Sequence, residues 1–458
     1  MFGRITDNCC GKDNCCGKSV HEVFPGFNPE QDRESWRLFR DSIAGKTLSQ
    51  LRCDHPGLLI FPLEFGSVKG IENEIVFSTD GEGDEQKLFT GNLMGFVGRN
   101  NCSLTISSRF YPNGNDYFLH YMLARASGCH IVDFEVGRQR ESIWDFLPFL
   151  FPRCLAEAWR QGIYRVSHRM ERNDDHVRGT IDVARHIRCN IPFQGRIAYS
   201  FSEKSINNPI NRLVRLTIDV LEKDSRYREL FNSDDKLFCE AVQQIKQYIG
   251  TGDIANRGEI IKDNLRPVSH PLFQCYKTLQ KLCLAILRHE KLTFGHDDNN
   301  VHGILFDGSW LWEEYLAKIM PPGIVHSDNR NRKNRLYALA EGTWEWYPDF
   351  YRKGDMVNAS IVIDAKYKNL DCGVGVSDQH QIVSYMYVLK AKMGGFVYPC
   401  ARDCDNVKHD CLGDLNGFGG KIYKFGVPVS PNASGYSEFV ERMGKVEEVF
   451  RRTINESI

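Results

Sequence analysis

An apolar, β-branched stretch that ends in two opposite charges constrains this chain more than any other feature of its sequence. The stretch is SIVIDAKYK, residues 360–368. Its apolar half predicts a buried strand. Because side chains alternate along a strand, Asp364 and Lys366 share one face. The sequence therefore places a carboxylate beside an ammonium group at the point where an apolar strand ends.

A second carboxylate is expected next to this pair. Pro348-Asp349 is the only Pro-Asp in the sequence, and it lies on a predicted strand, TWEWYPDFY, that a short turn brings back alongside residues 360–368. The other acidic-x-Lys triplets, at 85–87 and 234–236, have polar, turn-like surroundings and are interpreted as surface charges. Two neighbouring strands would thus bring Asp349, Asp364 and Lys366 together.

Two carboxylates and an amine are the groups that metal-assisted hydrolysis of a phosphodiester bond needs. Carboxylates are hard oxygen ligands for Mg²⁺, with Mn²⁺ as an alternative ion. Lys366 can stabilise negative charge on the reacting phosphate or orient the attacking water. The alternative interpretation is a solvated ion pair between Asp364 and Lys366, which would contribute little to stability. Further metal ligands are expected from the Ala365 carbonyl and from Glu313, with Glu314 as the alternative, on the predicted helix SWLWEEYLAKIM.

The chain divides into four segments of different character, which together predict an α+β multidomain fold. Residues 1–35, rich in Gly, Asp, Asn and Cys, predict a flexible extension. Residues 36–165 combine short alternating strands with helices, and 166–300 are mostly helical by period, interrupted by a strand or hairpin at 178–187. Residues 301–458 run helix, strand, strand, helix, strand, which predicts a compact α/β domain.

Composition argues for an ordinary globular protein with no strong field of its own. The formal net charge is -1, with 42% hydrophobic and 26% charged residues. Contact with nucleic acid therefore has to come from local patches or from a partner. The sixteen cysteines are scattered along a long chain without an apolar leader, so we expect a reduced, cytoplasmic protein. No apolar run approaches the roughly 20 residues of a membrane span.

Three segments keep two interpretations each. The first two are cysteine clusters with spacings unlike those of common zinc modules. The alternatives to zinc are a flexible tail for the first cluster and a polar surface loop for the second. The third is a basic run that either contacts phosphate or forms a solvated turn. In order they are Cys9, Cys10, Cys15 and Cys16; then Cys400, Cys404, His409 and Cys411; then NRNRKNR, residues 329–335.

The C-terminal segment resembles the PD-(D/E)xK nucleases. Pro348-Asp349 and Asp364-x-Lys366 match the motif that names this superfamily, so the resemblance implies a restriction-endonuclease-like domain over 301–458. On the next predicted helix, VSDQHQIVSYMYVLKAKM with Ser377 or Asp378 as N-cap, Gln381 and Tyr385 match the Gln-x-x-x-Tyr of RecB-like branches. There these two residues support the site or contact DNA.

Most of the chain is similar to the McrC family, the nuclease subunits of McrBC-type modification-dependent restriction systems. Glu313 matches the helical Glu of that family. Arg99 and Arg109 lie in a matching β-rich segment and are expected as surface arginines; family members often carry Pro where this chain has Ser108. The matching segments, in family order, are GFVGRNNCSLTISSRF, YFLHYMLARAS, RGTIDVARHI, INNPINRLVR, LWEEYLAKI, YPDF, VIDAKYK, QIVSY and GFVYP.

The resemblance implies a function beyond cutting. It implies a Mg²⁺-dependent DNA endonuclease subunit that binds a hexameric McrB-like AAA+ GTPase through residues 36–165 and stimulates its hydrolysis. It also implies that the partner recognises and delivers double-stranded DNA carrying a modification of the 5-methylcytosine type. Two alternatives stay open: a non-catalytic activator of the motor, and a stand-alone RecB-like nuclease.

Overall fold

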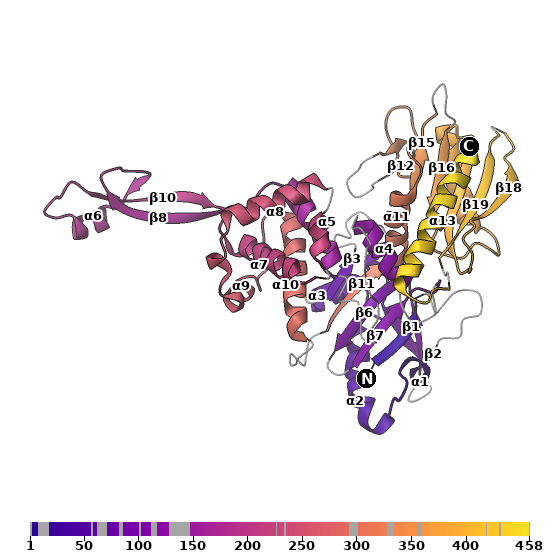
Figure 1. Ribbon diagram of the computed structural model, residues 1–458, viewed down its shortest axis with the longest axis horizontal. Coiled ribbons are helices and arrows are strands. Elements are labelled where there is room, and N and C mark those ends of the chain that lie inside the picture. The colour runs from indigo at the N-terminus through magenta and orange to yellow at the C-terminus, as the bar shows by residue number, and fades with distance from the viewer. Residues whose placement is uncertain are drawn as a thin grey trace. The chain divides into compact units, whose positions relative to one another are not determined.

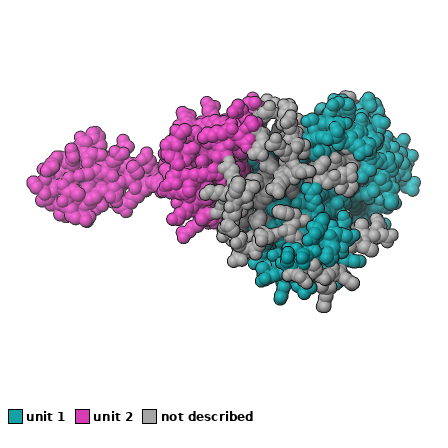
Figure 2. All heavy atoms as spheres, turned by 60° about the horizontal axis from the view of Figure 1, so that its bottom comes forward, with its two compact units in different colours: residues 1–149, 295–458 teal, residues 150–294 magenta. Residues whose placement is uncertain are grey.

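The computed structural model divides the chain into two compact units (Figure 2). Unit 1 is residues 1–149 with 295–458, and unit 2 is 150–294. These units differ from the four segments predicted from sequence character, since the first and last parts of the chain form one unit. The structure describes residues 2–7, 18–55, 58–61, 71–81, 86–99, 102–110, 117–127, 147–225, 227–232, 235–292, 301–327, 334–354, 360–417, 419–429 and 432–457.

A five-stranded sheet forms the first part of unit 1 (Figure 1). Its order is β1-β7-β6-β11-β3, with parallel pairs at β1–β7 and β11–β3 and antiparallel pairs between them. A smaller antiparallel sheet, β2-β5-β4, belongs to the same unit. The strands are β1 (Phe2–Thr6), β2 (Lys18–Ser19), β3 (Leu58–Phe61), β4 (Phe77–Asp80), β5 (Lys87–Thr90), β6 (Leu93–Arg99), β7 (Cys102–Ser107) and β11 (His302–Asp307).

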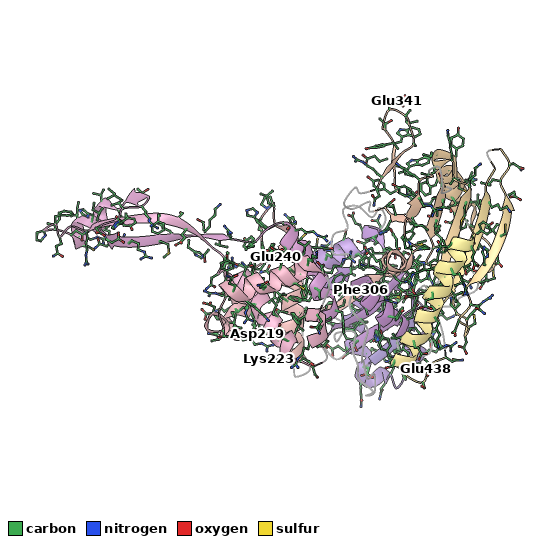
Figure 3. All side chains as sticks on the ribbon, turned by 45° about the horizontal axis from the view of Figure 1, so that its top comes forward. Asp219, Lys223, Glu240, Phe306, Glu341 and Glu438 are labelled. Atoms are coloured by element: carbon green, nitrogen blue, oxygen red, sulfur yellow. The ribbon has the colours of Figure 1, made fainter. Side chains whose placement is uncertain are left out.

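Helices bury one apolar core against these sheets. Trp36 and Phe39 pack with Phe77 of β4, and Trp36 Nε1 donates to Gln86 at 3.0 Å. Separately from this core, Phe306 of β11 (labelled in Figure 3) is 1% exposed and stacks on Phe61 at 5.2 Å. The helices are α1 (Val20–Val23), α2 (Pro29–Ile43), α3 (Leu48–Asp54) and α4 (Tyr117–Ser127).

The predicted flexible extension over 1–35 is wrong where the structure describes it. Phe2–Thr6 pair with β7 along their whole length, and Ile5 is 2% exposed. Asp7 continues this strand and accepts the Arg109 backbone N–H at 2.7 Å. The order of this segment comes from pairing with residues about a hundred positions away, which local composition cannot indicate.

The second part of unit 1 is a six-stranded mixed sheet of order β12-β15-β16-β17-β19-β18. The two central pairs, β16–β17 and β17–β19, are parallel, and the flanking pairs are antiparallel. A separate hairpin, β13–β14, carries Glu341 in its turn (labelled in Figure 3). The strands are β12 (Val325–His326), β13 (Leu336–Tyr337), β14 (Glu345–Trp346), β15 (Phe350–Arg352), β16 (Ile361–Ala365), β17 (Met393–Cys400), β18 (Lys408–Asp414) and β19 (Lys421–Pro428).

Three helices pack against this sheet. Helix α11 (Gly308–Ile319) follows β11 directly, with Asp307 as N-cap accepting from Trp310 N at 2.7 Å, and it ends before two prolines. Helix α12 (Val376–Leu389) buries Ile382 and Met386 against β16 and β17. Helix α13 (Tyr436–Glu456) places Glu447, 1% exposed, next to α4 and α11.

Unit 2 combines a helical bundle with a long hairpin (Figure 1). Strands β8 (Val166–Asp174) and β10 (Ile197–Ser205) pair over nine positions, and β9 (Thr180–Ile181) adds to β10. The long helix α7 begins within the segment NNPINR, with Asn208 as its N-cap and Pro209 in its first turn. The helices are α5 (Leu147–Arg160), α6 (Val183–Cys189), α7 (Pro209–Lys223), α8 (Lys236–Tyr248), α9 (Arg257–Asp263) and α10 (Gln274–Leu292).

Two local predictions are corrected by these elements. The mostly helical region contains the β8–β10 hairpin, and the segment 178–187 holds both β9 and the start of α6. No residue of β8 is buried, and β10 buries only the consecutive residues Ala198, Tyr199 and Ser200, so no apolar alternation marks the two strands. The single strand predicted over TWEWYPDFY is two strands in different sheets, because Pro348 has no N–H for a continuous ladder.

Within the described ranges, no helix combines the length and the apolar character that crossing a membrane requires.

Candidate active site

The pairing of β15 with β16 places Asp349 across from Asp364. Phe350 pairs with Ile363, so one further antiparallel step puts the two aspartates opposite each other on one face. The Asp349 Oδ2 atom accepts the Ala365 backbone N–H at 2.6 Å. The Asp349 carbonyl accepts from Ser327 N at 3.0 Å, which holds its backbone from the other side. The two strands thus bring both carboxylates to the end of β16.

Asp364 is a buried carboxylate whose charge is offset by one lysine. It is 1% exposed, and neither carboxylate oxygen accepts a hydrogen bond of good geometry. Its compensation is an ion pair in which Lys366 Nζ lies 2.6 Å from Oδ2. The Lys366 backbone N–H donates to the Val397 carbonyl at 2.9 Å, so the residue stays aligned with β17. Asp364 and Lys366 therefore lie on one face, as strand alternation predicts.

Burial and mutual repulsion change the proton affinity of these groups. The pKa of Asp349 is raised well above its ordinary value, by burial first and then by the charges of Asp364 and Glu313. Burial also raises the pKa of Asp364, although Lys366 opposes this effect. Burial alone would lower the pKa of Lys366, but the neighbouring carboxylates, led by Asp364, raise it overall. Lys366 is therefore an ammonium group at neutral pH.

Helix α12 brings Gln381 and Tyr385 to this lysine. Lys366 Nζ donates to Gln381 Oε1 at 3.1 Å, and Gln381 Nε2 donates to the Tyr385 hydroxyl at 3.4 Å. Trp346 packs edge-on against the Tyr385 ring at 5.7 Å. The two helix residues form a relay of hydrogen bonds that ends on the Lys366 ammonium group.

The two glutamates of α11 have different surroundings. Glu313 Oε1 is 2.8 Å from His326 Nε2, and its charge contributes to the raised pKa of Asp349. Glu314 accepts from Trp310 Nε1 at 3.2 Å, within its own helix. Glu313 is thus the glutamate whose charge acts on Asp349.

The carboxylates of the site are of the kind that binds a hard divalent cation, although they do not surround a common point. Two carboxylates repel each other here, and both oxygens of Asp364 lack good hydrogen bonds, so a cation would relieve the repulsion. Among the described residues, no three His, Cys, Asp or Glu side chains stand together at metal-binding separations. Glu313 is bonded to His326, and the two-aspartate set with bound water is the arrangement that fits Mg²⁺.

Sequence reasoning missed two partners of the site. Asp378, 6% exposed, lies 3.5 Å from Lys366 Nζ and also pairs with Lys368. It was expected as an N-cap, but α12 begins after Gly375, and the Asp378 carboxylate binds the two lysines instead. The spacing of three residues between Asp378 and Gln381 places both on one helix face, and this could have indicated Asp378 from the sequence. No sequence pattern could have indicated His326, because it reaches the site from β12.

The other candidate segments divide between described and undescribed residues. Cys9, Cys10, Cys15, Cys16 and most of NRNRKNR lie outside the described residues. In the 400–411 segment, His409 lies on β18 and stacks on Phe425, and Cys411 is exposed on the same strand. Among the described residues, these side chains do not stand together at metal-binding separations, so the structure gives the zinc interpretation no support.

Comparison with family models gives one match, which covers the site. Residues 88–399 match the model described as "McrBC 5-methylcytosine restriction system component". All seven predicted site residues, Ala365 included, lie in this range. The comparison with curated proteins gave no significant match.

Two solved structures are distantly similar. The first is the refined half-complex from a tetradecameric assembly of Thermococcus gammatolerans McrB AAA+ hexamers with bound McrC; it aligns with a TM-score of 0.47 and 15% identity over 100% of both chains. The second is the cryo-EM structure of the Thermococcus gammatolerans McrBC complex, with a TM-score of 0.30, 13% identity, and coverage of 70% of this chain and 87% of that one. Neither likeness is close enough to assign a role to a residue.

The raised pKa of Asp349 predicts that this carboxylate destabilises the metal-free protein. Above its ordinary pKa the unfolded chain releases the proton, whereas the folded chain retains it, so stability falls as pH rises towards the folded pKa. Asp349→Asn still accepts the Ala365 N–H but does not ionise. In EDTA, we expect its melting temperature to exceed that of the wild type at pH 8 and to match it near pH 4.

Asp414→Asn, at an exposed position on β18, is the matched control and should give no such difference. A melting temperature of Asp349→Asn that is equal to or below the wild-type value at pH 8 would contradict the assigned electrostatics.

Proposed function

Because this chain belongs to the McrBC 5-methylcytosine restriction system component family, we propose that it is the DNA-cleaving, McrC-type subunit of such a system. The proposed reaction is Mg²⁺-dependent hydrolysis of phosphodiester bonds in double-stranded DNA by a PD-(D/E)xK domain over 301–458. The proposed partner is a McrB-like AAA+ GTPase hexamer that delivers modified DNA, and this chain stimulates its hydrolysis. The place of action is proposed to be the cytoplasm.

One observation carries the catalytic part of this proposal. Asp349 and Asp364 meet across β15 and β16, and Lys366 Nζ lies 2.6 Å from Asp364. A purely structural ion pair would need one carboxylate, not two with raised pKa values. Ionisable groups whose pKa values are shifted by burial and by neighbouring charges are typical of functional sites.

The chain's own residues have distinct proposed tasks. Asp349 and Asp364 would hold the cation with bound water; the Ala365 carbonyl would be a further ligand, and Glu313 would be one only after it leaves His326. When bound, Mg²⁺ supplies Lewis-acid polarisation of the phosphate and lowers the pKa of a bound water. Lys366 is protonated, so it would stabilise charge on the phosphate rather than accept a proton. Gln381, supported by Tyr385, would orient the ammonium group.

The end of the β8–β10 hairpin is the proposed docking surface for the motor. Its exposed apolar side chains lie within 177–193, and α6 buries none of its residues. A small sheet that exposes so many apolar groups is typical of an interaction site. This surface lies outside the predicted docking segment, 36–165. The exposed apolar residues are Val177, Ile181, Val183, Ile187, Ile191 and Phe193.

The first prediction from the proposed function concerns the rate of DNA cleavage. Asp349→Ala or Lys366→Ala should lower the rate of DNA cleavage in the presence of the AAA+ partner by about 10²–10³-fold or more, because each removes a charge that acts at the phosphate. Stimulation of GTP hydrolysis should stay at the wild-type level. The measurement is single-turnover cleavage of methylated DNA alongside phosphate release from GTP.

Lys392→Ala, at an exposed position just before β17, is the control and should cleave normally. Unaltered DNA cleavage by Asp349→Ala would contradict the assignment of the active site. Motor stimulation without any cleavage by the wild type would favour the non-catalytic activator, and robust cutting without the partner would favour the stand-alone nuclease.

The second prediction concerns the metal and does not depend on activity. Mg²⁺ should raise the melting temperature of the wild type but not of Asp349→Asn, since a site filled at a hundred times its Kd adds about 2.7 kcal/mol. The effect should be larger at pH 8 than at pH 6, because protons compete for the carboxylates. Equal shifts in both proteins would exclude Asp349 as a ligand.

The third prediction concerns docking. The double variant Ile191→Ser with Phe193→Ser should weaken binding of the AAA+ partner on the order of 10-fold or more, because both side chains are 66% exposed and would be buried on docking. Calorimetry or interferometry measures the affinity. Leu272→Ser, at a 73% exposed position in unit 2 outside the hairpin, should bind normally. If both variants bind alike, the hairpin is not the docking surface.

A further inference from the structure

We propose that Arg109 is a positioning residue for Lys366, and that it fixes the end of β16 to the five-stranded sheet. This inference rests on the proposed nuclease function. Arg109 was expected at the surface, but it is half-buried and lies two residues after the end of β7. It reaches Tyr367, the residue immediately after Lys366, which lies just beyond β16 of the six-stranded sheet of unit 1.

The Arg109 side chain holds the backbone at the end of the catalytic strand. Its Nη2 donates to the Tyr367 carbonyl, and its Nη1 donates to Asn92 Oδ1 at 3.2 Å. The guanidinium also lies over the Tyr367 ring, 4.9 Å from its centroid. A planar group with several fixed N–H donors can make these contacts together, whereas a lysine cannot.

The Tyr367 side chain is enclosed by the same sheet. Its hydroxyl is 2.8 Å from Ser108 Oγ and donates to Met94 Sδ at 3.2 Å, and its ring meets Phe110 edge-on at 5.1 Å. Gly308, at the start of α11, leaves room for this ring, since a Cβ there would come within 2.5 Å of it. The ring therefore lies against both the five-stranded sheet and the helix that carries Glu313.

Arg109 is itself held in place from β1. Its backbone N–H donates to Asp7 Oδ1 at 2.7 Å, and Asp7 is fully buried. Burial raises the pKa of Asp7 to about 6, while the charge of Arg109 opposes the rise. Asp7 is thus a carboxylate in a neutral or alkaline assay and continues to accept this hydrogen bond.

These contacts restrict the movement of Lys366 because it lies between two fixed points. On one side, Ala365 N donates to Asp349 and Lys366 N donates to Val397. On the other side, the Tyr367 carbonyl and ring are held by Arg109 and its neighbours. A shift at Tyr367 would move the Lys366 ammonium group away from Asp364 and Gln381, which lie at 2.6 and 3.1 Å.

The test compares Arg109→Lys and Arg109→Ala with Arg99→Lys in the full chain with its AAA+ partner. Arg99 is a matched control in the same sheet, because it donates to the Leu38 carbonyl at 2.8 Å and to Ser42, both on α2. We expect both Arg109 variants to slow single-turnover cleavage on the order of 10²-fold, the effect of a displacement of about 1 Å. DNA affinity, GTPase stimulation and the Arg99→Lys rate should not change.

A second readout is independent of cleavage. Hydrogen–deuterium exchange should speed up at residues 361–368 in the Arg109 variants, although these residues are about 250 positions away, and not in Arg99→Lys. Wild-type exchange and cleavage in both Arg109 variants would overturn the proposal. So would equal losses in the Arg99 and Arg109 variants, which would indicate general unfolding. If the wild type does not cleave DNA, the proposed function fails, and the exchange comparison alone decides the positioning role.

Discussion

The repulsion between Asp349 and Asp364 is the interaction on which the C-terminal half of unit 1 depends. Two carboxylates beside an apolar strand are stable only when the surrounding structure over-determines their position. The antiparallel ladder, the Ala365 N–H and the Lys366 ammonium group supply that determination. Helix α12 adds Asp378 and Gln381, which restrain the lysine in turn. Without a bound cation this arrangement lowers the stability of the folded protein, and such a loss of stability is expected at a functional site.

Local sequence patterns predicted the structure correctly where an element buries one face and where its partners lie nearby in the sequence. The alternation of SIVIDAKYK correctly placed Asp364 and Lys366 on one face, and a short connection correctly placed Asp349 opposite them. The helices α4, α7 and α11 also follow their apolar periods and their breakers, such as the prolines after α11. Whether these side chains perform catalysis stays a prediction, since placement alone does not test it.

The same rules fail where order comes from distant partners or from surfaces without a core. Strand β1 is fixed by β7, and the β8–β10 hairpin has too few buried side chains to leave an alternating pattern. Arg109 gave no signal, because its contact with Tyr367 joins positions 258 residues apart. Asp378 was misassigned as a cap because a carboxylate near a helix start satisfies either role. In each case a tertiary contact outweighed the local preference.

For the proposed nuclease function, the charge balance of the site sets the order in which metal and DNA would bind. Once Asp349 is ionised, Asp349, Asp364 and Asp378 outnumber Lys366 and Lys368, and Lys366 is shared among the three carboxylates. A site with this excess of negative charge repels a phosphodiester until a divalent cation neutralises it. The whole chain offers no compensating field, at a formal net charge of -1. Under the proposed function, DNA would therefore be captured elsewhere in an assembly, and the site itself would favour DNA only once the cation is present. A nuclease subunit built in this way would be inactive without its cation and its partner, which would protect the DNA of the cell that contains it.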